Sequence, residues 1–385
     1  MSKMSSRLTY PMTRRTAVRL IGTLPWMAGG LLAACSTTPA GAHVASSPTI
    51  PAALAPGDTL DHFIAQQAAQ DQFSGTLLVA RGEQVTLERA YGWANQARHL
   101  PNRFETIYAL ASITKSFTAA AILQLAERGK LTLQDHLGMH LGGFPPAIAN
   151  AVTIDQLLNH TSGMGDYTQT PQFLSEKSSW TSAAQTMTGL LDIIRQQPLL
   201  FPPGTRYSYS DSGYVTLGGI VQQVAGQSYY DYIRQHIFRV AGMTQSDFYT
   251  RPQREQNALI AHPYSRRTES NPNAPRIDVS GTQDFIGGPD GGAYATVEDM
   301  LHYSRALQAY RLLDQTSTNL LLFGKSTPPS GKAPDRSVNG GAAGIATNLL
   351  MFPTLGWTVV ILSNYDPGQS FADLVAEAEK LVAQA

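Results

Sequence analysis

The alternation of apolar and polar residues predicts strands near both ends of the globular part of the chain. Residues 75–80 and 84–91 carry apolar side chains on either side of an Arg-Gly-Glu turn, which predicts a β-hairpin. Residues 345–352 and 357–364 flank a Pro-Thr-Leu-Gly turn in the same way and predict a second hairpin.

Apolar residues recur at helical spacing in other segments. Residues 116–128 show this pattern and are followed by Gly129, a typical helix stop. Thr153 is followed three residues later by Gln156, and Thr296 by Asp299. We interpret both pairs as capping boxes that open helices. Residues 371–382 predict a final amphipathic helix.

The order of these elements predicts an α+β fold of two lobes. Between about residues 131 and 287 the pattern is that of helices joined by long loops rich in Gly, Pro and Asn. The strands at both ends would share one antiparallel sheet flanked by the terminal helices, and the middle would form a mostly helical lobe. We therefore expect one catalytic domain over residues 58–385, with its active site in the cleft between the lobes.

The N-terminal residues predict an export signal. Arg14 and Arg15 precede an apolar stretch that is short for a membrane span and ends in small residues, as in a signal peptide. The paired arginines are typical of twin-arginine export. The segment 32–35, Leu-Ala-Ala-Cys, resembles a bacterial lipobox, and Cys35 is the only cysteine of the chain, so no intramolecular disulfide is possible.

We accordingly divide the N-terminal region into a twin-arginine-type lipoprotein signal peptide, residues 1–35, and a flexible linker, residues 36–57. The linker is rich in Ser, Thr, Pro and Ala and lacks periodicity. Lipidation of Cys35 would anchor the exported protein at the periplasmic face of a bacterial membrane. The alternative is a signal peptide that is not lipidated and contains a stray cysteine.

Composition excludes several classes of function. The chain has 28 basic and 28 acidic residues, so there is no basic excess of the kind that indicates nucleic-acid binding. Its nine histidines show no metal-ligand spacing, and we expect neither a metal nor a cofactor. A Gly-x-Ser-x-Gly sequence is absent, which argues against an α/β-hydrolase.

Ser112 and Lys115 form the only Ser-x-x-Lys sequence of the chain, at the expected start of a helix. A serine hydroxyl is a weak nucleophile until a base takes its proton. A lysine three residues on lies on the same helical face and can reach that hydroxyl. The backbone N–H of Ser112, at a helix N-terminus, would be free to bind a developing oxyanion. The alternative is a plain helix start with a surface lysine.

A second group of polar residues follows about a hundred positions later. A Pro-Pro-Gly turn precedes Tyr207, Tyr209 and Asp211, and an apolar helical pattern comes next. A tyrosine on a loop facing Ser112 would supply a phenolic oxygen, and a nearby lysine ammonium would favour its phenolate form as a general base. We assign this role to Tyr209 and expect Tyr207 and Tyr214 to pack as aromatic residues.

Together with a third, glycine-rich segment, these residues resemble the β-lactamase-related serine hydrolases, a family that includes class C β-lactamases, DD-peptidases, D-aminopeptidases and esterases. The likeness extends from about Leu60 to near the C-terminus. It rests on four stretches: Ser112-x-x-Lys115, residues 159–164 (Asn-His-Thr-Ser-Gly-Met), residues 203–211 and residues 340–344 (Gly-Gly-Ala-Ala-Gly). The resemblance implies the two-lobed fold described above.

Two positions depart from the family pattern. Asp211 stands where the family usually has Asn, so this side chain could accept from a substrate donor or hold Lys115 in its charged form. The third motif, usually Lys-Thr-Gly or His-x-Gly, is Val338-Asn339-Gly340, without the cation that helps bind the carboxylate of a β-lactam. This argues against an efficient β-lactamase, mildly against a DD-carboxypeptidase, and leaves an esterase possible.

The glycine run retains a possible role at the site. Gly341 could donate the second oxyanion N–H from an edge strand, while Asn339 and Gly340 would contact substrate. The alternative for Gly340 and Gly341 is a tight strand entry. His160 is expected to bond to backbone, and residues 284–292 are expected to form a turn-rich connection with some contacts to the cleft.

The sequence thus predicts a serine hydrolase that acts through an acyl-enzyme on a small ester, amide or peptide. We rank esters first, D-amino-acid amides or peptidoglycan-derived peptides second, and β-lactams third. A function of another class, an inactive lipoprotein that binds cell-wall fragments, is the remaining alternative.

Overall fold

The computed structural model describes residues 50–266, 274–324 and 336–385 of the chain. The predicted signal peptide, with Cys35, lies outside these residues, as do positions 36–49 of the predicted linker. The end of that linker was placed too far along the chain, because the turn η1 (Ala52–Leu54) already belongs to the fold. Leu54 is fully buried in a core cluster beside the first and last helices, so its apolar side chain fixes this segment.

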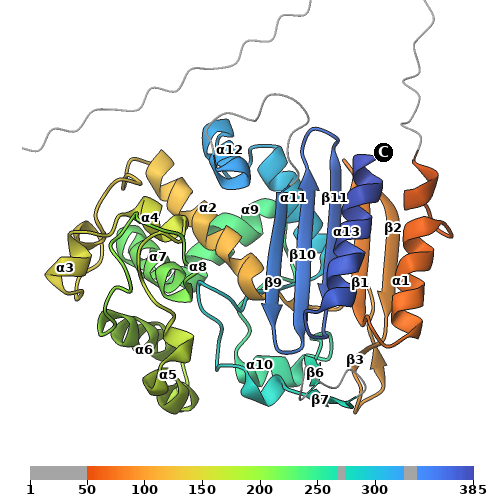
Figure 1. The fold of residues 1–385 in the computed structure, drawn as a ribbon, viewed down its shortest axis with the longest axis horizontal. Helices are drawn as coiled ribbons and strands as arrows, with labels where there is room; N and C mark the ends of the chain where they lie inside the picture. Colours follow the sequence, from red (N-terminus) through yellow and green to blue (C-terminus); the bar gives the residue numbers. More distant parts are fainter. Residues whose placement is uncertain (1–49, 267–273, 325–335) are drawn as a thin grey trace, which may run out of the picture. The chain divides into compact units, whose positions relative to one another are not determined.

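A five-stranded antiparallel sheet joins the two ends of the described chain (Figure 1). Its strand order is β2-β1-β11-β10-β9, and three two-stranded ribbons, β3-β4, β5-β8 and β6-β7, lie outside it. The strands are β1 (Gly75–Arg81), β2 (Gln84–Tyr91), β3 (Trp93–Asn95), β4 (Leu100–Pro101), β5 (Tyr108–Ala109), β6 (Tyr264–Arg266), β7 (Arg276–Asp278), β8 (Tyr294–Ala295), β9 (Arg336–Ala342), β10 (Ile345–Phe352) and β11 (Trp357–Ser363). Both predicted hairpins are confirmed, as β1-β2 and β10-β11.

Helices cover both faces of this sheet and build the second half of the molecule. They are α1 (Thr59–Ala69), α2 (Thr114–Glu127), α3 (Pro146–Ala149), α4 (Ile154–Leu158), α5 (Pro171–Glu176), α6 (Ala183–Arg195), α7 (Asp211–Ala225), α8 (Tyr229–Ile233), α9 (Arg239–Ala241), α10 (Arg251–Gln256), α11 (Val297–Gln308), α12 (Gln315–Phe323) and α13 (Gln369–Ala383). A π-helical turn, Arg234–Phe238, joins α8 to α9. Among the described helices, none is both long and apolar enough to cross a membrane.

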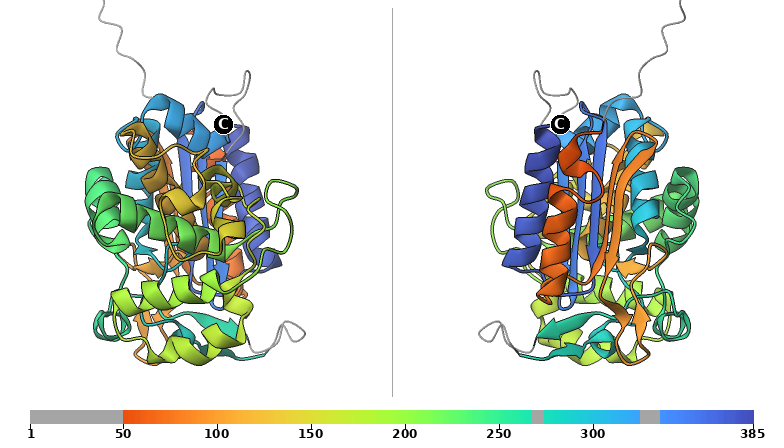
Figure 2. Two further views of the ribbon diagram at one scale, coloured as in Figure 1. Left: turned by 90° about the vertical axis from the view of Figure 1, so that its left-hand side faces the viewer. Right: turned by 90° about the vertical axis from the view of Figure 1, so that its right-hand side faces the viewer.

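Successive side chains of a strand point to opposite faces of the sheet, and helices cover both faces, so both sets of side chains are buried. Leu77 and Val79 of β1 belong to the core under α1 and α13, which lie side by side over one face (Figure 2). Leu78 and Ala80 belong to the larger core, which continues through α2 and α11 into the helical half. The fold is therefore of the α+β class, with an antiparallel sheet flanked by helices and a mostly helical part, as predicted.

The two predicted capping boxes have different outcomes. Thr153 and Gln156 make both reciprocal bonds at the start of α4, so that prediction is confirmed. At the start of α11 the Thr296 hydroxyl accepts from the Asp299 N–H, but the reverse bond is absent. The Asp299 carboxylate instead accepts from the backbone N–H groups of residues 244 and 245 and from a serine hydroxyl, so it ties α11 to a neighbouring loop.

Candidate active site

Ser112 lies in a short turn between the sheet side of the molecule and helix α2. The turn is η2 (Ala111–Ile113), and α2 begins only at Thr114, so the predicted helix start is preceded by a 3₁₀ turn. Ala111 has a φ of 45°, a left-handed conformation that is rare for a residue with a side chain. Such strain is typical of functional sites, and here it falls next to the candidate nucleophile.

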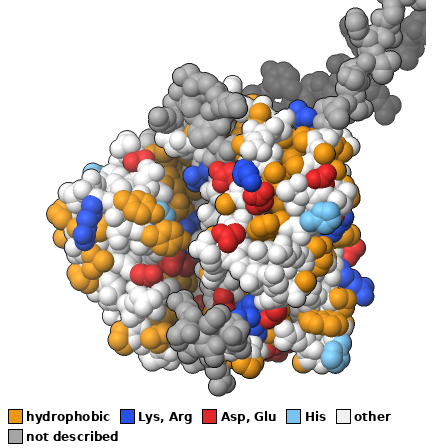
Figure 3. Space-filling view, turned by 45° about the vertical axis from the view of Figure 1, so that its right-hand side comes forward, with side chains coloured by type: hydrophobic (Ala, Val, Ile, Leu, Met, Phe, Trp, Pro, Cys, Tyr) orange, Lys and Arg blue, Asp and Glu red, His pale blue; other side chains and the backbone are white. Residues whose placement is uncertain are grey.

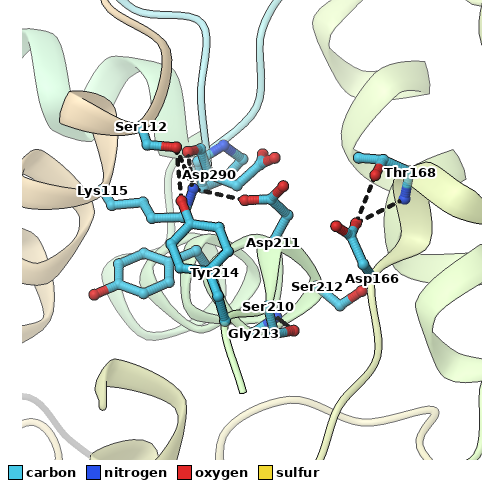
Figure 4. A network of polar contacts seen from close by, with 12 residues as sticks. Ser112, Lys115, Asp166, Thr168, Ser210, Asp211, Ser212, Gly213, Tyr214 and Asp290 are labelled. Carbon is cyan, nitrogen blue, oxygen red and sulfur yellow. Dashed lines mark hydrogen bonds and ion pairs between the residues drawn. The ribbon is translucent and has the colours of Figure 1, made fainter. Parts of the chain in front are cut away.

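Lys115 is buried in the first turn of α2, where oxygen atoms surround its ammonium (Figure 4). Its Nζ donates to Ser112 Oγ at 3.2 Å and to the Asp290 backbone oxygen at 2.5 Å, and it forms an ion pair with Asp211 Oδ1 at 2.6 Å. Burial alone would lower the pKa of Lys115, but the charges of Asp290 and Asp211 outweigh it and raise the pKa above its ordinary value. Lys115 is therefore a cation at neutral pH.

Tyr209 reaches Ser112 from the loop that precedes α7. Its hydroxyl lies 2.6 Å from Ser112 Oγ, and the Lys115 ammonium lies 4.8 Å from the centre of its ring. The next residue, Ser210, caps α7 by accepting from the Gly213 N–H, which fixes the loop against the helix. The structure thus brings together the serine, lysine and tyrosine that the sequence indicated.

His160 holds the Tyr209 loop in place. Its ring stacks on Tyr209 with 4.5 Å between centroids, and its Nδ1 accepts from the Ser210 N–H at 3.2 Å. Burial, assisted by the charge of Lys115, lowers the pKa of His160 to about 4. The imidazole is therefore neutral at pH 7 with its proton on Nε2. The expected backbone bond is confirmed, and the stacking contact is an addition that sequence reasoning missed.

Asp211 is the first residue of α7, directly after the Ser210 cap. Of the two roles considered for its carboxylate, the structure provides the contact with Lys115.

The two remaining tyrosines of this segment, Tyr207 and Tyr214, differ in their burial. Tyr214 is buried and donates to the Leu158 carbonyl, as expected for a packing residue. Tyr207 is 66% exposed and packs edge-on against the His160 ring, with 5.8 Å between centroids, so the expected aromatic packing occurs at the surface.

A buried carboxyl, Asp290, completes the surroundings of Lys115 and was not found from the sequence. Its Oδ2 accepts from the Tyr167 hydroxyl at 2.9 Å, while its Oδ1 is buried without a hydrogen-bond partner. Burial, together with the negative charge of Asp211, raises the pKa of Asp290 to about 7. The only sequence signal was its place in the turn-rich segment before Thr296, which indicated contact with the cleft but no particular residue.

Strand β9 brings the third motif to the edge of the sheet beside Ser112. A Cβ added at Gly340 would lie 2.1 Å from the Leu110 carbonyl oxygen and 3.1 Å from Ser112 N, so only glycine fits there. Gly340 is buried at this contact and lines neither of the two pockets that meet at Ser112. Its predicted role as a substrate-binding residue is therefore corrected to close packing of the strand.

The neighbours of Gly340 lie at the pockets. Gly341 is exposed on the edge strand and lines a pocket with Ser112, a position compatible with the predicted oxyanion role. Asn339 lines the other pocket, but its side-chain oxygen accepts from the amide of Asn348, its partner on β10. The amide oxygen is therefore engaged within the sheet, and the structure does not bring it to Ser112.

The two pockets meet at Ser112 in a hollow between the helical half and the sheet (Figure 3). The first has a volume of about 310 Å³ and includes Gly341, Asp211 and Asp290. The second has a volume of about 340 Å³ and includes Lys115 and Tyr209. Within the described ranges, no three His, Cys, Asp or Glu side chains are placed to hold a metal ion.

Comparisons with known proteins agree with this architecture. The Beta-lactamase family model matches residues 60–384. Penicillin-binding protein 4* of Bacillus subtilis is 27% identical over 331 residues, which is 80% of this chain and 71% of that protein. The crystal structure of a penicillin binding protein from Bacillus halodurans matches with a TM-score of 0.73 and 30% identity, over 85% of this chain and 100% of that one.

A hydrolase with promiscuous acyltransferase activity, EstCE1, shares the fold at a TM-score of 0.68 and 19% identity, over 84% of this chain and 97% of its own. At this identity the likeness concerns the fold alone. The match of the family model over most of the chain is decisive for membership, and the serine, lysine and tyrosine occupy one site in the hollow of that fold. The chain therefore belongs to the β-lactamase family, and two of the similar proteins above are named as penicillin-binding proteins.

Proposed function

We propose that this protein is a serine hydrolase that cleaves carboxylic esters through an acyl-enzyme on Ser112. The observation that carries the proposal is the placement of two partners on one hydroxyl, Tyr209 OH at 2.6 Å and Lys115 Nζ at 3.2 Å from Ser112 Oγ. A nucleophile with its activating group within hydrogen-bond reach, and a charged group behind it, is the arrangement that covalent catalysis requires.

The proton follows a short path in this mechanism. The Lys115 cation stabilises the phenolate of Tyr209, which takes the Ser112 proton as Oγ bonds to the substrate carbonyl carbon. When the tetrahedral intermediate collapses, the bond from carbon to the leaving oxygen or nitrogen breaks, and Tyr209 returns the proton to that atom. Water then attacks the acyl group by the same route, and Ser112 regains its proton as the carboxylic acid departs.

The oxyanion that forms in both steps needs hydrogen-bond donors. We assign this role to the backbone N–H groups of Ser112 and Gly341, because both residues line the first pocket. Backbone donors fixed by η2 and β9 would not have to reorganise during the reaction. This preorganisation is the main source of transition-state stabilisation in oxyanion holes.

Esters rank first among substrates because Val338 places an apolar side chain where β-lactam-binding relatives carry a cation. D-aminoacyl amides or peptides are the second candidate. They are favoured by a relative in Escherichia coli named as a putative D-alanyl-D-alanine carboxypeptidase, which is 29% identical over 203 residues, 49% of this chain and 46% of that protein. β-Lactams rank third.

Hydrolysis of p-nitrophenyl butyrate by the full-length protein tests this proposal, beside Ser112→Ala and Lys115→Ala. We expect turnover in the wild type and its loss in both variants. Full turnover by Ser112→Ala would exclude the mechanism. An inactive wild type would be assayed on a D-aminoacyl peptide panel, where turnover indicates a peptidase and tight binding without turnover indicates a binding protein. Rapid nitrocefin hydrolysis would reverse the ranking of β-lactams.

We also propose export and lipid anchoring through Cys35, on the sequence pattern given above. Membrane and soluble fractions of the wild type and Cys35→Ala should be compared by immunoblot. We expect the wild type in the membrane fraction and the variant released from it. Unchanged attachment of the variant would argue against lipidation of Cys35.

A further inference from the structure

The first pocket, which we call the acyl pocket, is where the acyl part of the substrate lies in the proposed mechanism. Gly341, the proposed oxyanion donor, lines this pocket, whereas Tyr209 lines only the second of the two pockets. Because Tyr209 returns the proton to the leaving atom, the departing group extends into the second pocket. The size and the walls of the acyl pocket therefore decide which acyl groups can reach Ser112.

The acyl pocket is small for a ligand site. Its volume of about 310 Å³ is near the lower end of the range of roughly 300–1,000 Å³ that is usual for such pockets. Buried aromatic side chains form part of its walls: Tyr167 and Phe173 of the helical half, and Tyr294 of β8. Closely packed walls of this kind do not move easily to admit a larger group.

A row of contacts leads from the catalytic centre to one end of this pocket. Asp290, whose backbone oxygen accepts from the catalytic lysine, also accepts from the Tyr167 hydroxyl. The Tyr167 ring meets the Phe173 ring edge-on, with 4.9 Å between centroids. Lys177 lies beyond Phe173, with its Nζ 5.2 Å from the centre of that ring. Figure 1 shows α5, which directly precedes Lys177, apart from α2 and the sheet, so this end of the pocket is the one away from the nucleophile.

Lys177 connects the two sides of the pocket at this end. It begins the 3₁₀ turn η5 (Lys177–Ser179) of the helical half. Its Nζ forms an ion pair with Asp284 Oδ1 at 3.0 Å and donates to the Thr282 carbonyl oxygen at 3.2 Å. All three residues line the acyl pocket. Asp284 and Thr282 belong to the segment between β7 and β8, so the lysine side chain spans the pocket from one wall to the other.

The segment that carries Asp284 is held in place by α10. The buried Arg254 donates to the Asp284 backbone oxygen at 2.7 Å, and Arg251 donates to the Gln283 backbone oxygen at 3.2 Å. This wall is therefore fixed independently of Lys177. The ion pair itself is partly open to solvent, with side chains that are 28% and 29% exposed, so its removal should cost little stability.

We propose that the ion pair between Lys177 and Asp284 closes the end of the acyl pocket and thereby restricts the enzyme to short acyl groups. The inference rests on the proposed acyl-enzyme function and specifies its substrate class: esters or amides of short carboxylic acids. A longer alkyl chain would have to separate the two partners, which would leave a charge beside apolar carbon. Lys177 thus determines specificity and takes no part in the chemistry.

Two esters with the same leaving group test the proposal: p-nitrophenyl butyrate and p-nitrophenyl decanoate. Since the leaving group does not change, the ratio of their kcat/KM values depends on the acyl side alone. The full-length wild type should prefer the butyrate. Lys177→Ala should raise the decanoate-to-butyrate ratio about tenfold or more, because each methylene group that becomes buried past the truncated side chain contributes about fourfold.

Further variants sharpen the comparison. Asp284→Ala should raise the ratio in the same direction, because Lys177 loses its charged partner, whereas Lys177→Arg keeps the charge and should retain the wild-type ratio. Lys380→Ala is the matched control: it breaks an ion pair of the same length, 3.0 Å, on α13, and Lys380 lines neither pocket. High salt should raise the ratio of the wild type and leave that of Lys177→Ala unchanged, because salt screens an exposed pair.

The outcomes separate this inference from the function on which it rests. A wild type that hydrolyses both esters equally well, or a Lys177→Ala variant with the wild-type ratio, would overturn the role of the ion pair and leave the hydrolase intact. If the wild type turns over neither ester, the proposed function fails, and calorimetric binding of the two esters to Ser112→Ala decides the matter. A gain in decanoate affinity relative to butyrate when Lys177→Ala is added supports the closed end, and unchanged relative affinities exclude it.

Discussion

At the scale of single residues, the site places two carboxyl groups, Asp211 and Asp290, around one buried lysine. Asp211 and Asp290 both act on Lys115, and one of the two carboxyls, Asp290, is itself held neutral over most of the acidic range by burial. A cation buried among apolar groups would be unstable without such partners. The replacement of the family's usual Asn by Asp211 therefore has a physical consequence, because it adds a full charge at 2.6 Å from Nζ.

Asp211→Asn should move the pH dependence of catalysis. The charge of Asp211 raises the pKa of Lys115, so its removal lowers that pKa. Because the mechanism needs Lys115 charged, the alkaline limb of the kcat/KM profile should shift to lower pH. The measurement is ester hydrolysis between pH 6 and 10, beside the exposed-carboxylate control Asp192→Asn. Superimposable profiles for wild type and Asp211→Asn would contradict the role assigned to this ion pair.

Asp290→Asn should change how stability depends on pH. Burial raises the pKa of Asp290 to about 7, from an ordinary value of 3.8, so between these pH values the unfolded chain has released a proton that the folded protein still holds. Wild-type stability therefore falls as pH rises through this range, and an asparagine, which does not titrate, removes that loss.

Relative to wild type, the Asn variant should gain on the order of 1 to 3 kcal/mol of unfolding free energy between pH 4.5 and 8. Urea unfolding at several pH values measures this difference. The neutral amide can still accept from Tyr167, so the comparison isolates the charge. A difference between the two proteins that does not vary with pH would show that Asp290 is ionised in the fold throughout.

At the scale of elements, the close approach of β9 to the η2 turn depends on a glycine. Gly340→Ala would put a methyl group 2.1 Å from the Leu110 carbonyl oxygen, so either the strand or the η2 turn has to move. Since η2 carries Ser112, we expect at least a hundredfold loss of ester turnover, because a displacement of about 1 Å can cost that much, together with a lower Tm.

The neighbouring variant Gly341→Ala is the control for folding. Its Cβ would come no closer than 3.4 Å to Pro367, an ordinary contact, so its Tm should stay near that of wild type. Circular dichroism melts and p-nitrophenyl butyrate assays on the two variants provide the comparison. Equal melting temperatures and equal activities would show that the close approach of β9 to η2 is not needed.

At this scale, the sequence could predict contacts between residues close together in the chain, but not contacts between residues far apart in it. Hairpins β1-β2 and β10-β11 follow from local alternation and turn residues, and the approach of Lys115 to Ser112 follows from helical spacing. The Asp290 contact joins residues 175 positions apart and has no motif, so local patterns could not find it. The hydrogen bond between Asn339 and Asn348 was not predicted, because it depends on the register of β9 against β10, which the third motif does not reveal.

At the scale of the whole molecule, the sheet contributes side chains to both main hydrophobic cores, one on each of its faces. Trp357 of β11 is fully buried in the core under α1 and α13, while its strand neighbours also contribute to the core that reaches the helical half. Because β1 and β9 lie on opposite sides of the β10-β11 hairpin, both ends of the described chain depend on that hairpin. Damage to the core distant from Ser112 should therefore unfold the catalytic half as well.

Trp357→Ala tests this coupling. Truncation of a buried tryptophan typically costs about 3–5 kcal/mol, whereas Trp93→Ala, at a site that is 42% exposed, should cost less than about 1 kcal/mol. We expect loss of ester turnover and loss of far-UV circular dichroism to coincide during urea unfolding of Trp357→Ala, at a lower midpoint than in wild type. Turnover that persists after most of the helical signal has disappeared would show instead that the helical half and η2 hold the site without the core under α1 and α13. Coincident curves would mean that the position of Ser112 is maintained by the sheet as a whole, since the substituted residue lies on the opposite face from the active site.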